Sequence, residues 1–134
     1  MRIESLVSRP AVRAEASESL MAAARRMWAH EIGALPVFEG DALVGIISER
    51  DVVAALALGA SLETALAAHM TSVPATAEPG EDSVTVANRM LDLGVRHLPV
   101  VEGGRAVGMI SATDLLTLVA WPERHPQDCV AVSA

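Results

Sequence analysis

The pattern of apolar and polar positions occurs twice along the chain. GALPVFEGDALVGIISERDVV begins at Gly33 and RHLPVVEGGRAVGMISATDLL begins at Arg96, an offset of 63 residues without a gap. The match continues backwards, where it pairs Met27 with Met90. Self-similarity at a fixed spacing indicates a repeated structural unit. We therefore predict repeats at residues 1–60 and 61–120, followed by a C-terminal tail at 121–134.

Each repeat predicts an extended piece followed by an amphipathic helix. The extended pieces are expected near Val12 and Thr76. Ser19 and Asp82 precede the helices and have side chains suited to an N-cap, while Gly94 is a good terminator of the second helix. Apolar residues at helical spacing predict the core-facing sides, which are expected to be Leu20, Ala24, Met27 and Trp28 in the first copy and Val86, Met90, Leu91 and Leu93 in the second.

A hairpin and a second helix complete each repeat. Glycine-containing turns between two apolar runs are typical of hairpins. The expected strands are 35–38 and 43–47 around the turn at 39–41, and 98–101 and 106–110 around the turn at 102–104. The final helices are expected at 49–58 and 112–119.

The resulting unit is β-α-β-β-α, which places the chain in the α+β class. A unit of about 60 residues buries little surface by itself. Two copies that stack sheet against sheet solve this problem and create a pseudo-two-fold axis with two equivalent clefts. Ligand pockets favour such seams between subdomains.

Composition narrows the function classes. Apolar residues make up 51% of the chain, but only two Trp and one Phe are aromatic, so small aliphatic side chains must fill the core. The formal charge of −7 argues against binding to nucleic acid or to an anionic membrane surface. The longest apolar stretch, 52–62, is shorter than the ~20 residues of a membrane helix. With no secretory leader at the N-terminus and a single cysteine, we expect a soluble cytoplasmic protein.

One doubled motif carries a family resemblance. Leu-Pro-Val, a glycine turn and then Val-Gly-x-x-Ser-x-x-Asp occur at 35–51 and again at 98–114. This order resembles the core signature of CBS domains, and two copies resemble a Bateman module, over nearly the whole chain from Ile3 to Val119. Only the tail from Trp121 lies outside the resemblance. The chain is thus similar to stand-alone CBS-pair proteins.

The resemblance implies a regulatory module without catalytic activity. Similar modules bind AMP, ADP, ATP, NAD or S-adenosylmethionine in the clefts between repeats, alone or with Mg²⁺, and signal to a partner protein, which the sequence does not identify. Similar pairs form homodimers through Ala-rich helices such as those expected at 53–58 and 62–68. No cofactor is required. The alternative is a ligand-free dimerisation or adaptor protein, and an enzyme ranks last because no catalytic constellation is present.

The Ser-x-x-Asp motifs are the first candidates for binding. Each lies where a strand passes into a helix, and a helix N-terminus attracts phosphate groups. On the family pattern Asp51 and Asp114 would accept hydrogen bonds from the two ribose hydroxyls, with Ser48 and Ser111 nearby. The same spacing is that of a capping box. Spacing alone does not separate the two roles, and they can coexist.

The repeats differ just before Leu-Pro-Val. The second copy has Arg96-His97, where the first has Gly33-Ala34. Because the fork of an arginine matches phosphate oxygens, we favour the cleft that uses Arg96, His97 and Asp114. The alternatives are a solvated Arg96 with a half-buried His97, or a reach across the axis toward Asp51.

Small apolar residues are expected to flank the adenine. They are Val12, Ala14, Ala75 and Ala77, with Ile46, Ile47, Met109 and Ile110 as walls, and their alternative role is ordinary core. Arg50 could supply charge to the first cleft or pair with Glu49. The full set of nucleotide-binding candidates is Ser48, Arg50, Asp51, Arg96, His97, Ser111, Thr113, Asp114, Val12, Ala14, Ala75 and Ala77.

Other chemical motifs are missing from the sequence. It contains no P-loop, no G-x-G-x-x-G and no nucleophile elbow. Its four histidines have no metal-ligand spacing with one another or with Cys129, so no metal site and no catalytic residue is predicted. Cys129, in the polar tail, is expected to be an idle surface thiol.

Overall fold

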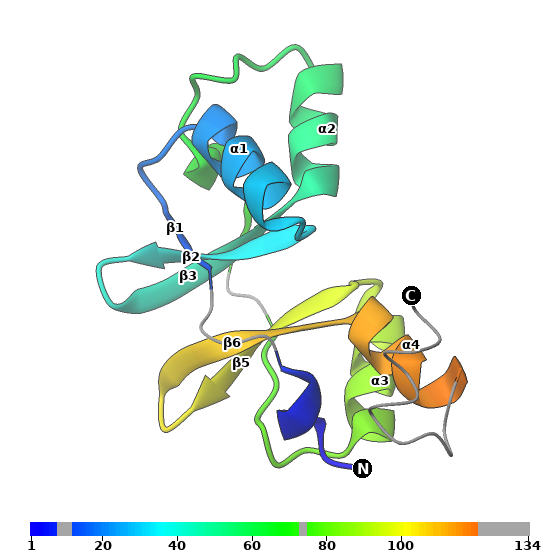
Figure 1. Cartoon of the computed structure of the whole chain (residues 1–134). Helices are drawn as coiled ribbons and strands as arrows, with labels where there is room; N and C mark the ends of the chain where they lie inside the picture. The colour runs from blue at the N-terminus through cyan, green and yellow to red at the C-terminus, as the bar shows by residue number, and fades with distance from the viewer. Residues whose placement is uncertain (8–11, 73–74, 121–134) are drawn as a thin grey trace.

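The computed structural model describes residues 1–7, 12–72 and 75–120, so the tail with His125 and Cys129 lies outside the described residues. The chain forms two lobes that meet at their sheets, with one helix pair in each lobe (Figure 1). The expected α+β class and the two repeats are confirmed. In the second repeat the first strand is reduced to one parallel bridge between Ala77 and Val100.

The first lobe contains a four-stranded sheet in the order β1-β2-β3-β4. β1 pairs parallel with β2, and β3 pairs antiparallel with both β2 and β4. The elements of this half of the chain are η1 (Ile3–Leu6), β1 (Ala14–Glu15), α1 (Leu20–His30), β2 (Ala34–Glu39), β3 (Ala42–Ser48), α2 (Glu49–Ala57), η2 (Leu66–Ala68) and β4 (Thr71–Ser72).

The second lobe repeats the hairpin and the helix pair. β5 and β6 pair antiparallel with a register shift at Val100/Val101, as β2 and β3 do at Val37/Phe38. Gly40 and Gly103 take positive φ in the two turns, a conformation that glycine adopts at no steric cost. The elements are α3 (Ser83–Leu93), β5 (His97–Glu102), β6 (Arg105–Ser111) and α4 (Ala112–Ala120).

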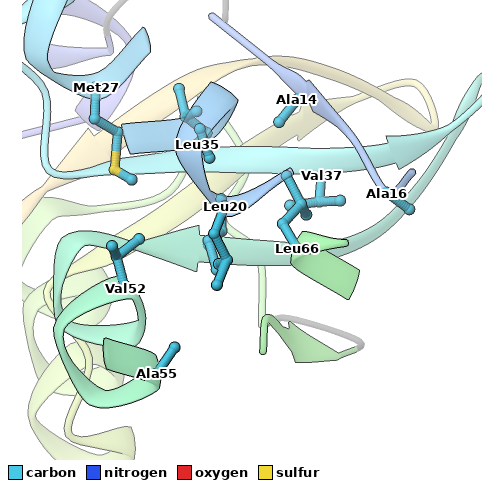
Figure 2. Packing of buried hydrophobic residues seen from close by; sticks show 11 residues of the cluster. Ala14, Ala16, Leu20, Met27, Leu35, Val37, Val52, Ala55 and Leu66 are labelled. Carbon is cyan, nitrogen blue, oxygen red and sulfur yellow. The ribbon is translucent and has the colours of Figure 1, made fainter. Parts of the chain in front are cut away.

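The leading segment of each repeat, which holds η1 in the first repeat and η2 in the second, packs on the other lobe. Ile3 is fully buried in the core of the second lobe, and its N–H donates to the Glu81 carbonyl at 3.0 Å. Leu66, its counterpart 63 residues later, is buried with Leu20 in the first core (Figure 2), and its N–H donates to the Glu18 carbonyl at 2.8 Å. The boundary near residue 60 therefore divides the repeated sequence, whereas each hydrophobic core takes residues from both sides of it.

The expected helix caps are present. The Ser19 hydroxyl accepts from the Ala22 N–H, and the Asp82 carboxylate accepts from the Val84 N–H. α3 ends at Gly94 in the left-handed conformation. At the equivalent end of α1 the left-handed residue is Glu31, with φ of 54°.

The expected apolar faces of these helices were partly wrong. Leu20 and Met27 of α1 and Val86 and Met90 of α3 are buried as expected, and Ala24 packs against the first core. Trp28, however, is 86% exposed, Leu91 is 78% exposed and Leu93 is also exposed. Each helix buries only the narrow stripe that faces its own lobe. Trp28 and Leu91 directly follow the buried Met27 and Met90, about 100° around the helix axis, and meet solvent.

Candidate functional site: a cleft between the two lobes

A cleft of about 470 Å³ lies between the two lobes and takes side chains from both. Its volume falls within the range of about 300–1,000 Å³ typical of small-molecule sites. The second repeat contributes Arg96, His97, Met109, Ser111, Ala112, Thr113 and Asp114, and the first contributes Val12, Glu31, Ile32, Gly33, Ala34 and Glu49.

The N-terminus of α4 opens into this cleft. Ser111 and Asp114 form a reciprocal cap, in which the Asp114 N–H donates to the Ser111 Oγ at 3.0 Å and the Ser111 N–H to the Asp114 Oδ2 at 2.8 Å. The Ala112 N–H donates to the Arg96 carbonyl at 2.7 Å. Within the described residues no hydrogen bond engages the Thr113 N–H or the Asp114 Oδ1. The helix therefore offers the cleft one backbone donor and one carboxylate acceptor.

The N-terminus of α2 has the same construction. Ser48 and Asp51 form a full capping box, and the Glu49 N–H donates to the Gly33 carbonyl at 2.9 Å. Ser48, Asp51 and the exposed Arg50 do not line the cleft described above. The capping role of the motif is thus present in both repeats, while the capping Ser and Asp side chains line the cleft only in the second.

His97 meets the other repeat at Gly33. A Cβ at Gly33 would lie 3.2 Å from the His97 Cε1 and 3.0 Å from the Glu49 Oε1, tighter than ordinary contacts. The imidazole ring and the Glu49 carboxylate therefore come together over a position that has no side chain. Gly33 makes room for this contact between the repeats.

Burial lowers the pKa of His97 from its ordinary value of 6.5. Removal from water is the largest cause, the nearby carboxylates of Glu49 and Asp114 oppose it, and the Arg96 guanidinium adds to it. The half-buried imidazole therefore favours its neutral form at neutral pH.

The apolar candidates separate into two groups. Val12 and Met109 line the cleft. Ala14 and Ala77 are each 1% exposed and lie in the two cores together with Ile47 and Ile110, while Ala75 packs against the second core. Ile46 is half-buried and is not part of the cleft wall.

Of the wall that the first repeat supplies, sequence reasoning identified only Val12. Glu31, Ile32 and Glu49 also line the cleft but were not among the candidates. The repeat itself held a usable signal, because a pseudo-two-fold axis brings equivalent positions together. Gly33-Ala34 is equivalent to Arg96-His97, and both pairs line the same cleft.

The described residues carry neither a metal-binding cluster nor a membrane-spanning helix. Residues 1–7, 12–72 and 75–120 contain no group of three or more His, Cys, Asp or Glu side chains arranged to hold a metal ion. Among these residues, no helix combines the length and apolar character needed to cross a bilayer.

Known proteins share this architecture. A family model for the CBS domain matches residues 3–58 and 65–120. An uncharacterized protein of Methanocaldococcus jannaschii is 35% identical over 99 residues, and the match covers 72% of this chain but 35% of that protein. The chain thus spans about a third of that relative's length.

Solved structures are similar along nearly their full length. A CBS-domain protein from Burkholderia ambifaria superimposes with a TM-score of 0.87 at 26% identity, covering 93% of this chain and 98% of that one. The CBS domain pair of protein MJ0100, solved with 5′-methylthioadenosine and S-adenosyl-L-methionine, gives 0.85 at 30% identity, covering 92% and 98%. With both repeats matched in sequence and in fold, the chain belongs to the CBS domain family and carries a pair of these domains.

Proposed function

We propose that this chain is a cytoplasmic regulatory module, without catalytic activity, that binds an adenosine-type compound in the cleft between its lobes and signals to a partner protein. The observation that carries the proposal is the composition of the cleft. A pocket of ligand size brings Arg96, His97 and Asp114 together with the free Thr113 N–H. The adenosine ligands of the similar MJ0100 pair support the ligand class.

Each group has a stated role in the proposal. The free Asp114 Oδ1 accepts from the ribose hydroxyls, since an ionised carboxylate is an acceptor only. The Thr113 N–H and Arg96 lie on the side of the ribose 5′ group, because both are donors at the helix N-terminus. Val12 and Met109 provide apolar surface for the adenine ring.

A thermal-shift panel tests ligand binding. AMP, ADP, ATP, NAD and S-adenosylmethionine, each with and without Mg²⁺, are added in excess, and a ligand of the native state raises Tm by mass action. Asp114→Ala should abolish the shift. Because Asp114 also caps α4, this variant should lose about 1 kcal/mol of stability by itself.

Asp51→Ala is the matched control, because it removes the same cap from α2 without touching the cleft. It should lower Tm to a similar extent and keep the ligand shift. Equal loss of the shift in both variants would contradict the assigned role of Asp114.

The second candidate function is a dimerisation or adaptor module without a ligand. The observation that favours it is that both motif aspartates already serve as helix caps. A panel in which no adenosine compound moves Tm supports this alternative against ligand binding.

We also propose a homodimer formed through the outer helix faces. These faces expose apolar side chains, and apolar surface tends to be buried at interfaces. They include Trp28, Val84, Leu91, Leu93 and Leu116. Light scattering should give twice the 14.0 kDa mass of the chain, and Leu91→Glu should shift the species toward the monomer. A wild-type monomer at high concentration would contradict this proposal.

A further inference from the structure

The charge of the cleft is unusual for a phosphate site. Among the described residues, its acidic lining residues are Glu31, Glu49 and Asp114, and its one lining arginine is Arg96. His97 adds no full charge at neutral pH, because burial holds its pKa down. One guanidinium offsets one carboxylate, so among the described lining residues two carboxylates have no basic counterpart.

The two glutamates belong to the first repeat and have no acidic counterpart in the second. Glu49 is equivalent to Ala112, and Glu31 is equivalent to Gly94. The Glu49 carboxylate lies against the Gly33 position, which the His97 ring also approaches. The excess negative charge therefore comes from residues of the first repeat, which face Asp114 of the second repeat across the cleft.

The negative charge of the cleft should favour some adenosine compounds over others, according to the charge of their 5′ group. A phosphate group carries about 1.5 to 2 negative charges at pH 7, so AMP and ATP bring like charge to the carboxylates. Repulsion between like charges in a cleft opposes binding, and this repulsion weakens as salt is added. A 5′ thioether brings no charge, and a sulfonium compound brings a positive one.

Resting on the proposed adenosine site, we infer that the cleft takes adenosine derivatives whose 5′ substituent carries no net negative charge, and that Glu31 and Glu49 exclude phosphorylated nucleotides. The two glutamates are specificity residues in this inference. Asp114 holds the part that all adenosine compounds share.

Titration calorimetry with four probes tests the inference on the full chain. 5′-Methylthioadenosine and S-adenosylmethionine should bind more tightly than AMP, and AMP more tightly than ATP. The glutamates are replaced by isosteric amides, Glu31→Gln and Glu49→Gln. Each should narrow the ratio of the AMP Kd to the methylthioadenosine Kd by about fivefold.

Glu102→Gln is the control for net charge, because Glu102 is an exposed residue that ends β5 and does not line the cleft. It should leave the ratio of the two Kd values as in the wild type. Raising the salt concentration should narrow the wild-type ratio more than that of the double Gln variant.

Three outcomes are distinguishable. Preference for the uncharged and cationic probes, lost in the Gln variants, supports the inference. AMP or ATP binding at least as tightly as methylthioadenosine overturns it while the proposed adenosine site stands. No binding of any of the four probes overturns the proposed function, and the inference with it.

Discussion

Arg26 on α1 donates to both carboxylate oxygens of Glu18, at 2.9 Å from Nη1 and 2.7 Å from Nη2. Nη1 also donates to the Arg13 carbonyl at 2.8 Å, so the second half of α1 is tied to the segment that precedes the helix. Arg89 and Glu81 form the same arrangement in the second repeat. The two repeats thus share this ion pair as well as their backbone fold.

The Arg26 hydrogen bonds lower the pKa of Glu18 to about 2 from its ordinary 4.5. The folded state therefore holds this carboxylate ionised where the unfolded state takes up a proton. Its stabilisation is complete above pH 4.5 and is lost as the pH falls toward 2. Glu18→Gln should cost about 1–2 kcal/mol at pH 7 and progressively less in acid.

Urea unfolding at pH 7 and pH 3 measures this difference. Glu63→Gln, an exposed carboxylate without a side-chain partner among the described residues, should match the wild type at pH 7. A cost for Glu18→Gln that does not depend on pH would show that the ion pair contributes nothing specific.

Gly45 on β3 should not tolerate a side chain. A Cβ there would lie 2.7 Å from the Thr71 carbonyl oxygen and 2.6 Å from the Met70 sulfur. The carbonyl belongs to β4, the strand that pairs with β3, and cannot move without breaking that pairing. Gly45→Ala should therefore destabilise the fold by about 1–3 kcal/mol, the usual cost of overpacking.

Gly80→Ala is the matched variant, because a Cβ at Gly80 would meet nothing within 4 Å and its φ is not positive. It should change the free energy of unfolding by less than about 0.5 kcal/mol. Chemical denaturation of both variants checks the pair, and equal effects would contradict the close approach of β4.

Glu31 lies in the left-handed conformation that its counterpart Gly94 adopts without strain. This conformation costs a residue with a Cβ about 1–2 kcal/mol, whereas glycine adds about 0.5–1 kcal/mol of unfolded-state entropy. Glu31→Gly should therefore stabilise the fold by about 0.5–1 kcal/mol. Gly94→Ala should destabilise the fold. A lower Tm for Glu31→Gly than for the wild type would contradict the proposed backbone strain at Glu31.

His97 should make stability depend on pH near neutrality. Its pKa in the folded state lies below the ordinary 6.5, despite the facing carboxylates of Glu49 and Asp114. As the pH falls through 6.5 the unfolded chain takes up a proton that the folded chain resists, so stability decreases. Above 6.5 the two states hold the same neutral ring and the effect vanishes.

His97→Gln should flatten the decrease in Tm between pH 7 and pH 5. His30→Gln, at an exposed histidine on α1, is the comparison variant and should keep the wild-type slope. An unchanged slope in His97→Gln would show that the imidazole remains hydrated.

The sequence pattern predicted the hairpin strands and the helices α2 and α4 within one or two residues, because turn glycines and capping side chains mark their ends locally. It did not predict β4, and the helix expected at 62–68 was wrong, since only the short 3-10 turn η2 (Leu66–Ala68) forms there. It did not predict that Trp28 and Leu91 face solvent. Periodicity reports which residues share a face and does not report whether anything covers it. The wall from Glu31 to Ala34 was missed for a related reason, since its role arises only when the two lobes meet. The assigned roles of Arg96, His97 and Asp114 stay predictions.

The exchange of leading segments has a consequence for how such a chain can arise. A single repeat built this way has its own leading segment directed away from its core, so two copies complete each other. The present chain has the form of that exchanged pair with the two polypeptides joined between Gly59 and Ser61. Identical copies must have identical clefts. The two copies of a joined chain can differ, as Gly33-Ala34 and Arg96-His97 do, and only then can one side of a cleft carry charge that the other lacks.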